Sequence, residues 1–255
     1  MLNRIVANIS EKLSPIKSIS ILGKENLDAV IQRNHRGKRV IFSPNHLIPQ
    51  GMHADLRKNM AFAEDHFVFD KLLKQHNLKS RVVARGDADM EIGDSKINKL
   101  KYDFHRKIFS LFVKSATGGI PIAINAKESA YATKVNEAAK DEMMNTKENI
   151  TIYPYGNWFE SGSQNFSKNE DLNNEDKFVS KSNFEDWRIS LKKGFIEVAM
   201  QTNDPIVPVY VENNNGEWKI NIGKPIYTSF DESNVELAKK YLDAMQKLKI
   251  EAKKG

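Results

Sequence analysis

The chain of 255 residues contains no cysteine. This absence excludes a disulfide framework and any mechanism that passes through an enzyme thiolate, and it is compatible with a reducing, cytosolic compartment. Covalent cysteine catalysis is therefore ruled out from the start. At this length one large α/β domain with a full core is the simplest expectation, because the composition gives no sign of a second domain.

Long apolar runs are also absent. No run approaches the roughly 18 residues that span a bilayer, and the first residues lack the uninterrupted apolar block of a signal peptide. We therefore expect a protein that is soluble or peripheral to a membrane. Residues 1–17, "MLNRIVANISEKLSPIK", form an amphipathic pattern with apolar residues at helical spacing: Leu2, Ile5, Val6, Ile9 and Leu13. Two interpretations stay open, a helix on a membrane surface and a helix packed on its own domain.

Acidic residues are outnumbered, which leaves a formal charge of +6 and a pI near 9.2. This balance favours an acidic partner, such as nucleic acid, anionic lipid or an acidic carrier protein. The basic residues are spread along helices and tails, as in "KLKIEAKKG", and no zinc ligands, RNA-recognition signature or helix-turn-helix pattern occurs. We expect no nucleic-acid binding. We also expect no metal site, because the histidines lack a ligand spacing such as H-E-x-x-H.

Strand-like apolar runs alternate with helical patterns along the chain. The expected strands are 39–44, 80–85, 118–124, 150–155, 206–212 and 218–223, and the expected helices are 66–76, 96–116, 127–147, 187–202 and 233–252. This order predicts a single α/β domain over 1–255, with a mixed, largely parallel sheet flanked by helices. The polar segment 160–186 is expected to be a long surface loop. In such a sheet ligands gather beyond the carboxyl ends of the strands.

Four features stand at the expected strand ends, and their order is more informative than any one of them. They are "IFSPNH", which ends in His46, then "TGGIPI", "IYPYG" and "DPIVPV". A lone histidine is more often structural than catalytic, so His46 gains its interest from this context. The stretches "SLKKGFIEVAMQTNDPIVPV" and "INIGKPI" follow in the same order.

This succession resembles the glycerolipid acyltransferase superfamily, whose best-known members are lysophosphatidate acyltransferases. The family's motifs are N-H-x4-D after the first strand, a G-x-x-x-x-x-R block, F-P-E-G-T-R and an apolar V-P-V strand. The resemblance covers roughly residues 38–226.

The resemblance implies transfer of a fatty acyl group from a thioester donor, acyl-CoA or acyl carrier protein, to a hydroxyl of a lysolipid or related acceptor. It implies no further cofactor. His46 would act as general base, with a carboxylate on its other ring nitrogen and no covalent acyl-enzyme. It also implies a cytoplasmic protein that is peripheral to the inner face of the membrane.

The carboxylate partner of His46 is not given directly, because the family's spacing falls on Gly51. Asp65 begins "DHFVFDKLL", which looks like the family's acid at a helix start, with an insertion before it. We favour Asp65, although a carboxylate there is also an ordinary helix cap. The alternatives are Asp55, with His53 as another base, and Asp70, one turn after His66.

The third motif departs from the family. Tyr155, Gly156, Asn157 and Trp158 stand where the family has Glu-Gly-Thr-Arg, and the arginine of the preceding block falls on Ile124. The family's arginines are thought to hold the acceptor's phosphate, which suits a guanidinium fork.

Lys127, or the pair Lys192 and Lys193, is the expected substitute for the missing arginines. The aromatic rings of Tyr155 and Trp158 then indicate an acceptor other than simple lysophosphatidate, unless they only close the top of the sheet. The alternative function is a degenerate family member that binds an acyl chain or a membrane without catalysis.

Overall fold

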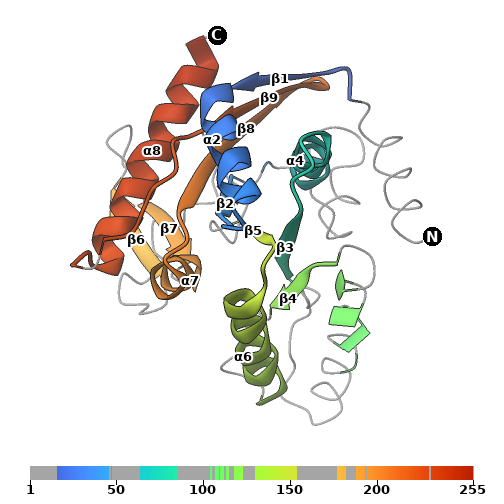
Figure 1. Cartoon of the computed structure of the whole chain (residues 1–255), viewed down its shortest axis with the longest axis vertical. Coiled ribbons are helices and arrows are strands. Elements are labelled where there is room, and N and C mark those ends of the chain that lie inside the picture. Colours follow the sequence, from blue (N-terminus) through green and yellow to red (C-terminus); the bar gives the residue numbers. More distant parts are fainter. Residues whose placement is uncertain are drawn as a thin grey trace.

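In the computed structural model, a twisted sheet runs through the molecule with helices on both of its faces (Figure 1). The structure describes residues 16–45, 47, 64–85, 104, 107–108, 110–111, 113–114, 118–122, 130–153, 177–181, 188–192, 194–229 and 231–254. The strands are β1 (Ser18–Leu22), β2 (Ile41–Pro44), β3 (Ser80–Arg85), β4 (Ile120–Ile122), β5 (Asn149–Ile152), β6 (Lys177–Lys181), β7 (Arg188–Lys192), β8 (Ile206–Asn214) and β9 (Glu217–Ile222). The helices are α2 (Lys24–His35), α4 (Glu64–Gln75), α6 (Ala130–Asn145), α7 (Gly194–Thr202) and α8 (Asn234–Lys254).

Seven strands form the main sheet, in the order β1-β9-β8-β2-β5-β3-β4. The five strands from β8 to β4 run parallel to one another. β9 is antiparallel to β8, and β1 pairs in parallel with β9. The carboxyl ends of β8, β2, β5, β3 and β4 therefore share one edge of the sheet. The expected fold, a single-domain α/β structure with a mixed and largely parallel sheet, is confirmed.

Two apolar cores lie on opposite faces of this sheet, because successive side chains of a strand point to opposite sides. Phe42 of β2 packs with α2 and α4 on one face, and its neighbour Ile41 packs with α6, α7 and α8 on the other. The connections account for this division. The crossovers from β2 to β3 and from β4 to β5 travel in opposite directions along the sheet, so right-handed connections place α4 and α6 on opposite faces.

The sequence-based expectations were wrong at two places. The helix expected over 187–202 begins only at Gly194, because Arg188–Lys192 forms strand β7. That strand pairs in antiparallel fashion with β6, Lys177–Lys181, which lies inside the segment expected to be a loop over 160–186. Strands of only five residues carry too little periodicity to stand out from a loop.

The N-terminal elements β1 and α2 were not expected either. Ile19 and Ile21 of "SISIL" do alternate with polar residues, but the run is short. β1 gains its stability from pairing with β9, whose sequence lies some two hundred positions away. Of the expected amphipathic helix over 1–17, residues 1–15 lie outside the described residues; Ile16 packs partly buried against the core of α2 and α4.

Gly23 makes the turn between β1 and α2. Its φ of 69° lies in the left-handed region, and a Cβ added here would lie 2.1 Å from the carbonyl oxygen of Ile222. Only glycine allows this close approach of the two backbones. The turn is further held by Asn26, whose Nδ2 donates to the same carbonyl oxygen at 2.8 Å.

Helix α8 begins with a reciprocal cap that makes a testable contribution to acid stability. The Glu236 carboxylate accepts hydrogen bonds from the backbone N–H and hydroxyl of Ser233, and these two bonds lower the pKa of Glu236, with a smaller contribution from Lys240. A lowered pKa in the folded state means that the contribution to stability is present above the unfolded pKa and is lost as pH falls through the folded pKa. Glu236→Gln keeps the cap geometry without the charge, so urea titrations should show a shallower loss of stability below about pH 4 than in the wild type. An equal loss of unfolding free energy below about pH 4 in the two proteins would contradict this prediction.

Candidate active site at the carboxyl edge of the sheet

The neighbouring strands β2 and β5 form a topological switch point. The chain leaves β2 through α4 to reach β3, beyond β5, whereas it leaves β5 to reach β8, on the other side of β2. Because the two connections diverge, a crevice is expected beyond the carboxyl ends of these two strands. Asn45, Asp65 and Tyr153 lie at this edge.

Asn45 follows β2 directly and is fully buried. Its amide makes the paired bonds of a strand: Nδ2 donates to the carbonyl oxygen of Val211 at 3.0 Å, and Oδ1 accepts from the N–H of Val211 at 2.6 Å. Its own N–H donates to the carbonyl oxygen of Val209 at 3.2 Å. An asparagine side chain thus continues the β2 and β8 pairing by one step and anchors the chain at the residue before His46.

Asp65 lies in the first turn of α4 and is only 1% exposed. Its two carboxylate oxygens accept from two different backbone groups, the N–H of Leu47 at 2.8 Å and the N–H of His66 at 2.8 Å. A buried carboxylate requires such donors, and the first turn of a helix favours negative charge. The carboxylate therefore connects the start of α4 with the chain one residue beyond His46.

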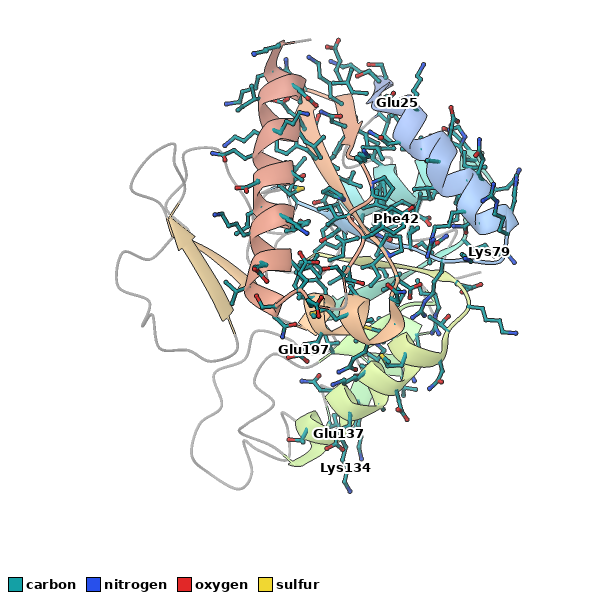
Figure 2. All side chains as sticks on the ribbon, turned by 60° about the vertical axis from the view of Figure 1, so that its left-hand side comes forward. Glu25, Phe42, Lys79, Lys134, Glu137 and Glu197 are labelled. Atoms are coloured by element: carbon teal, nitrogen blue, oxygen red, sulfur yellow. The ribbon has the colours of Figure 1, made fainter. Side chains whose placement is uncertain are left out.

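The position of Asp65 is set by the packing of α4 on the sheet. Phe69, one turn further along α4, meets Phe42 of β2 edge-on with 5.3 Å between ring centroids, and both rings are fully buried. Phe42 lies in the interior of the molecule (Figure 2). Val68 and Leu72 are buried on the same side of the helix. The spacing 65, 68, 69 and 72 is that of one helix face, so the face that packs on β2 also presents Asp65.

Tyr153 follows β5 as Asn45 follows β2. Its ring meets the His66 ring edge-on, with 6.2 Å between centroids, and its hydroxyl is buried. Burial raises the pKa of the Tyr153 hydroxyl well above its ordinary value, and the negative charges of Asp65 and Asp70 raise it further. The hydroxyl therefore stays protonated at neutral pH and remains a hydrogen-bond donor beside these carboxylates.

Asp70 has a different environment from Asp65. Its Oδ2 lies 2.5 Å from Nζ of Lys74, one turn along the same helix, and the side chains of Asp70 and Lys74 are 28% and 73% exposed. It therefore belongs to an exposed ion pair of a common helical type.

Of the residues singled out from the sequence, the structure places Asp65 at the carboxyl edge beside the chain that follows β2. His46, His53, Asp55, Lys127, Tyr155, Gly156, Asn157 and Trp158 lie outside the described residues, as does Lys193. Lys192 is the last residue of β7.

Sequence reasoning missed the roles of Asn45 and Tyr153, although both lie inside the quoted motifs. The available signal was position: each is a polar or aromatic residue directly after a buried run.

No protein-family model matches the chain, and neither does any curated protein. Among solved structures, the chain is similar to the 1-acyl-sn-glycerophosphate (LPA) acyltransferase PlsC from Thermotoga maritima. The identity is 13%, the TM-score is 0.44, and the match covers 96% of this chain and 79% of that chain.

Proposed function

We propose that this protein is an acyltransferase that moves a fatty acyl group from a thioester donor to a hydroxyl of a lysolipid or related acceptor. The observation that carries the proposal is the buried Asp65 carboxylate, bonded to the N–H of Leu47 directly after His46, at the switch point of a parallel sheet. Together with the order of the sequence motifs, this supports His46 as general base and Asp65 as its partner.

The chemistry needs only these two groups. The neutral imidazole of His46 takes the proton of the acceptor hydroxyl while that oxygen attacks the thioester carbonyl. The carbon–sulfur bond then breaks, and the thiol of CoA or of the carrier protein leaves with the proton from the imidazolium. The Asp65 carboxylate selects the imidazole tautomer and stabilises the positive charge. No enzyme nucleophile takes part, so the absence of cysteine places no limit on this route.

The environments of the carboxylates support Asp65 over Asp70. Asp65 is held rigidly by two backbone donors in a buried place, where its charge acts through a low dielectric. Asp70 is neutralised by Lys74 in a partly exposed pair. The charge of Asp65 also acts on the buried Tyr153 hydroxyl and helps to raise the pKa of that hydroxyl.

The acceptor is proposed to differ from simple lysophosphatidate. The family's motif arginines are replaced at Trp158 and Ile124, and a guanidinium fork is the group best suited to a phosphate. Tyr155 and Trp158 offer stacking area and polar ring groups, with Lys127 as a point charge. A sugar, an amine-bearing head group or a lipid interface fits this set. The protein would work at the cytoplasmic face of a membrane.

A transfer assay tests the function. Purified protein is given labelled acyl-CoA or acyl carrier protein with a panel of lysophospholipids, glycolipids and amine-bearing lipids, beside His46→Ala as the control for contaminating activity. We expect one acceptor class to be acylated by the wild type, at a rate above that with lysophosphatidate. Lysophosphatidate as by far the best acceptor would refute the acceptor proposal. Lipid binding with no transfer to any acceptor would instead indicate a binding protein that has lost catalysis.

A further inference from the structure

Three large apolar side chains are exposed on one short helical stretch between β3 and β4. The exposed fractions are 63% for Phe104, 49% for Ile108 and 64% for Leu111. In the part of the chain that the structure describes, only Tyr227 and Val235 are other large apolar residues of comparable exposure. The described pieces of this stretch lie next to β4, the edge strand of the sheet (Figure 1).

The three side chains share one face of the helix. Residues at i, i+4 and i+7 fall within about 60° of one another at about 100° per residue. Ser110 lies about 120° from Phe104 on the same projection and is buried at 9% exposure, as is Val113 at 5%. The helix is therefore packed through its opposite side. Its C-terminal end contacts α6, since Lys114 Nζ lies 3.6 Å from a Glu142 carboxylate oxygen of that helix.

Positive charge borders the apolar face. Lys107 is exposed and projects to the flank of the stripe, about 60° from Phe104 at this helical spacing, and Lys114 is exposed at the C-terminal end of the stretch. By composition, residues 96–114 contain six Lys or Arg residues and a single acidic one, Asp103. An exposed apolar stripe with basic flanks matches the interfacial helices that lie on anionic lipid.

We propose that the face formed by Phe104, Ile108 and Leu111 docks this protein on an anionic lipid surface. The apolar side chains enter the boundary between head groups and acyl chains, and the positive charges of Lys107 and Lys114 attract the anionic head groups. The charge of this face favours anionic lipid over a second copy of the chain. A symmetric contact between two copies would bring like charges together, whereas anionic lipid supplies the opposite charge. The proposal does not depend on acyl transfer, because docking requires no catalysis. Among the described residues, no helix is both long and apolar enough to cross a bilayer.

A cysteine scan provides a direct test, because the natural chain has no cysteine to interfere. Phe104→Cys, Ile108→Cys and Leu111→Cys are labelled singly with an environment-sensitive fluorophore in the full-length protein. Vesicles of 70% zwitterionic and 30% anionic phospholipid should cause a blue shift and stronger emission at all three positions. Val235→Cys, at an equally exposed position on α8, serves as the control and should show neither change. Unchanged spectra at 104, 108 and 111 while the protein is bound to vesicles would overturn the proposal and assign binding to another segment.

A sedimentation experiment with the same vesicles measures the contribution of the face. The triple variant Phe104→Ser, Ile108→Ser and Leu111→Ser should bind at least about tenfold more weakly, while Val235→Ser binds as the wild type. Binding should also fall as salt is raised, and less steeply in Lys107→Gln with Lys114→Gln. Equal binding by the triple variant and the wild type would refute the proposal. The proposal would also be refuted if the wild type were a dimer and the triple variant a monomer, because the face would then bind a second copy of the chain.

Discussion

Replacing His46 with alanine, or Asp65 with asparagine, is expected to lower the rate of acyl transfer by about a hundredfold to ten-thousandfold, the range of a general base. In the proposed mechanism, His46→Ala removes the general base, and Asp65→Asn leaves the imidazole without the carboxylate that selects its tautomer and stabilises its positive charge. The double variant should lose little more than either single variant, because two groups that act as a unit are not additive. Rates with the best acceptor of the panel measure all three effects.

Asp70→Asn is the matched control on the same helix. Asp70 is partly exposed and paired with Lys74, so we expect its loss to change transfer by less than about threefold. Asp65→Asn also puts an NH₂ group against one of two backbone donors, Leu47 N–H or His66 N–H, which should cost about 1–3 kcal/mol of stability. The assay therefore uses protein shown by circular dichroism to be folded.

The pH profile separates a catalytic role of Asp65 from a structural one. A carboxylate beside the imidazole favours its charged form and so raises the histidine pKa. In Asp65→Asn the acidic limb of the kcat/KM profile should therefore move to lower pH, in addition to the lower plateau. A lower plateau with an unmoved limb would mean that Asp65 only holds the fold, and full activity of the variant would exclude it from the site.

Arg39→Met is expected to destabilise the fold by about 3–5 kcal/mol. Arg39 precedes β2 at the amino edge of the sheet, where its Nε lies 2.6 Å from Oδ2 of Asp204. One Nη also donates to the carbonyl oxygens of Met143 and Thr146, at 2.7 and 2.5 Å. The side chains of Arg39 and Asp204 are 8% and 11% exposed. Removing the guanidinium leaves a buried carboxylate and two carbonyl groups without their donor, and urea denaturation measures the result as a lower midpoint.

Two controls accompany this measurement. Arg39→Met with Asp204→Leu removes both charges and should recover part of the loss, because a buried charge without a partner costs more than an apolar replacement of the pair. Lys74→Met breaks the exposed pair with Asp70 and should change stability by no more than about 0.5 kcal/mol. A loss for Arg39→Met no larger than that for Lys74→Met would contradict the prediction.

Much of the sheet could be predicted from the sequence because its central strands are buried on both faces. The run ending in Pro44 and the run over 206–212 are almost continuously apolar, and such runs are distinctive. Short strands without this signal, β1, β6 and β7, were missed, because their stability comes from a partner strand and not from their own pattern.

The candidate site could be predicted only in part. The position of Asp65 at a helix start after an apolar strand pointed to it, and the structure places it in the first turn of α4. The bond from Leu47 N–H to Asp65 bridges 18 sequence positions, and no local pattern determines a distance across such a gap. For the same reason Asn45 passed unnoticed: its amide is paired with Val211, 166 positions later.

The sequence by itself determined the α/β class, the largely parallel sheet and the exclusion of thiolate chemistry, since periodicity and composition are local properties. Only the tertiary structure decided which strands are neighbours, and hence that β2 and β5 form the switch point. It alone also showed that Asp65 is buried while Asp70 is paired at the surface, and that Phe104, Ile108 and Leu111 face outward. Burial and strand order depend on contacts between distant parts of the chain, which the packing of helices on the sheet establishes.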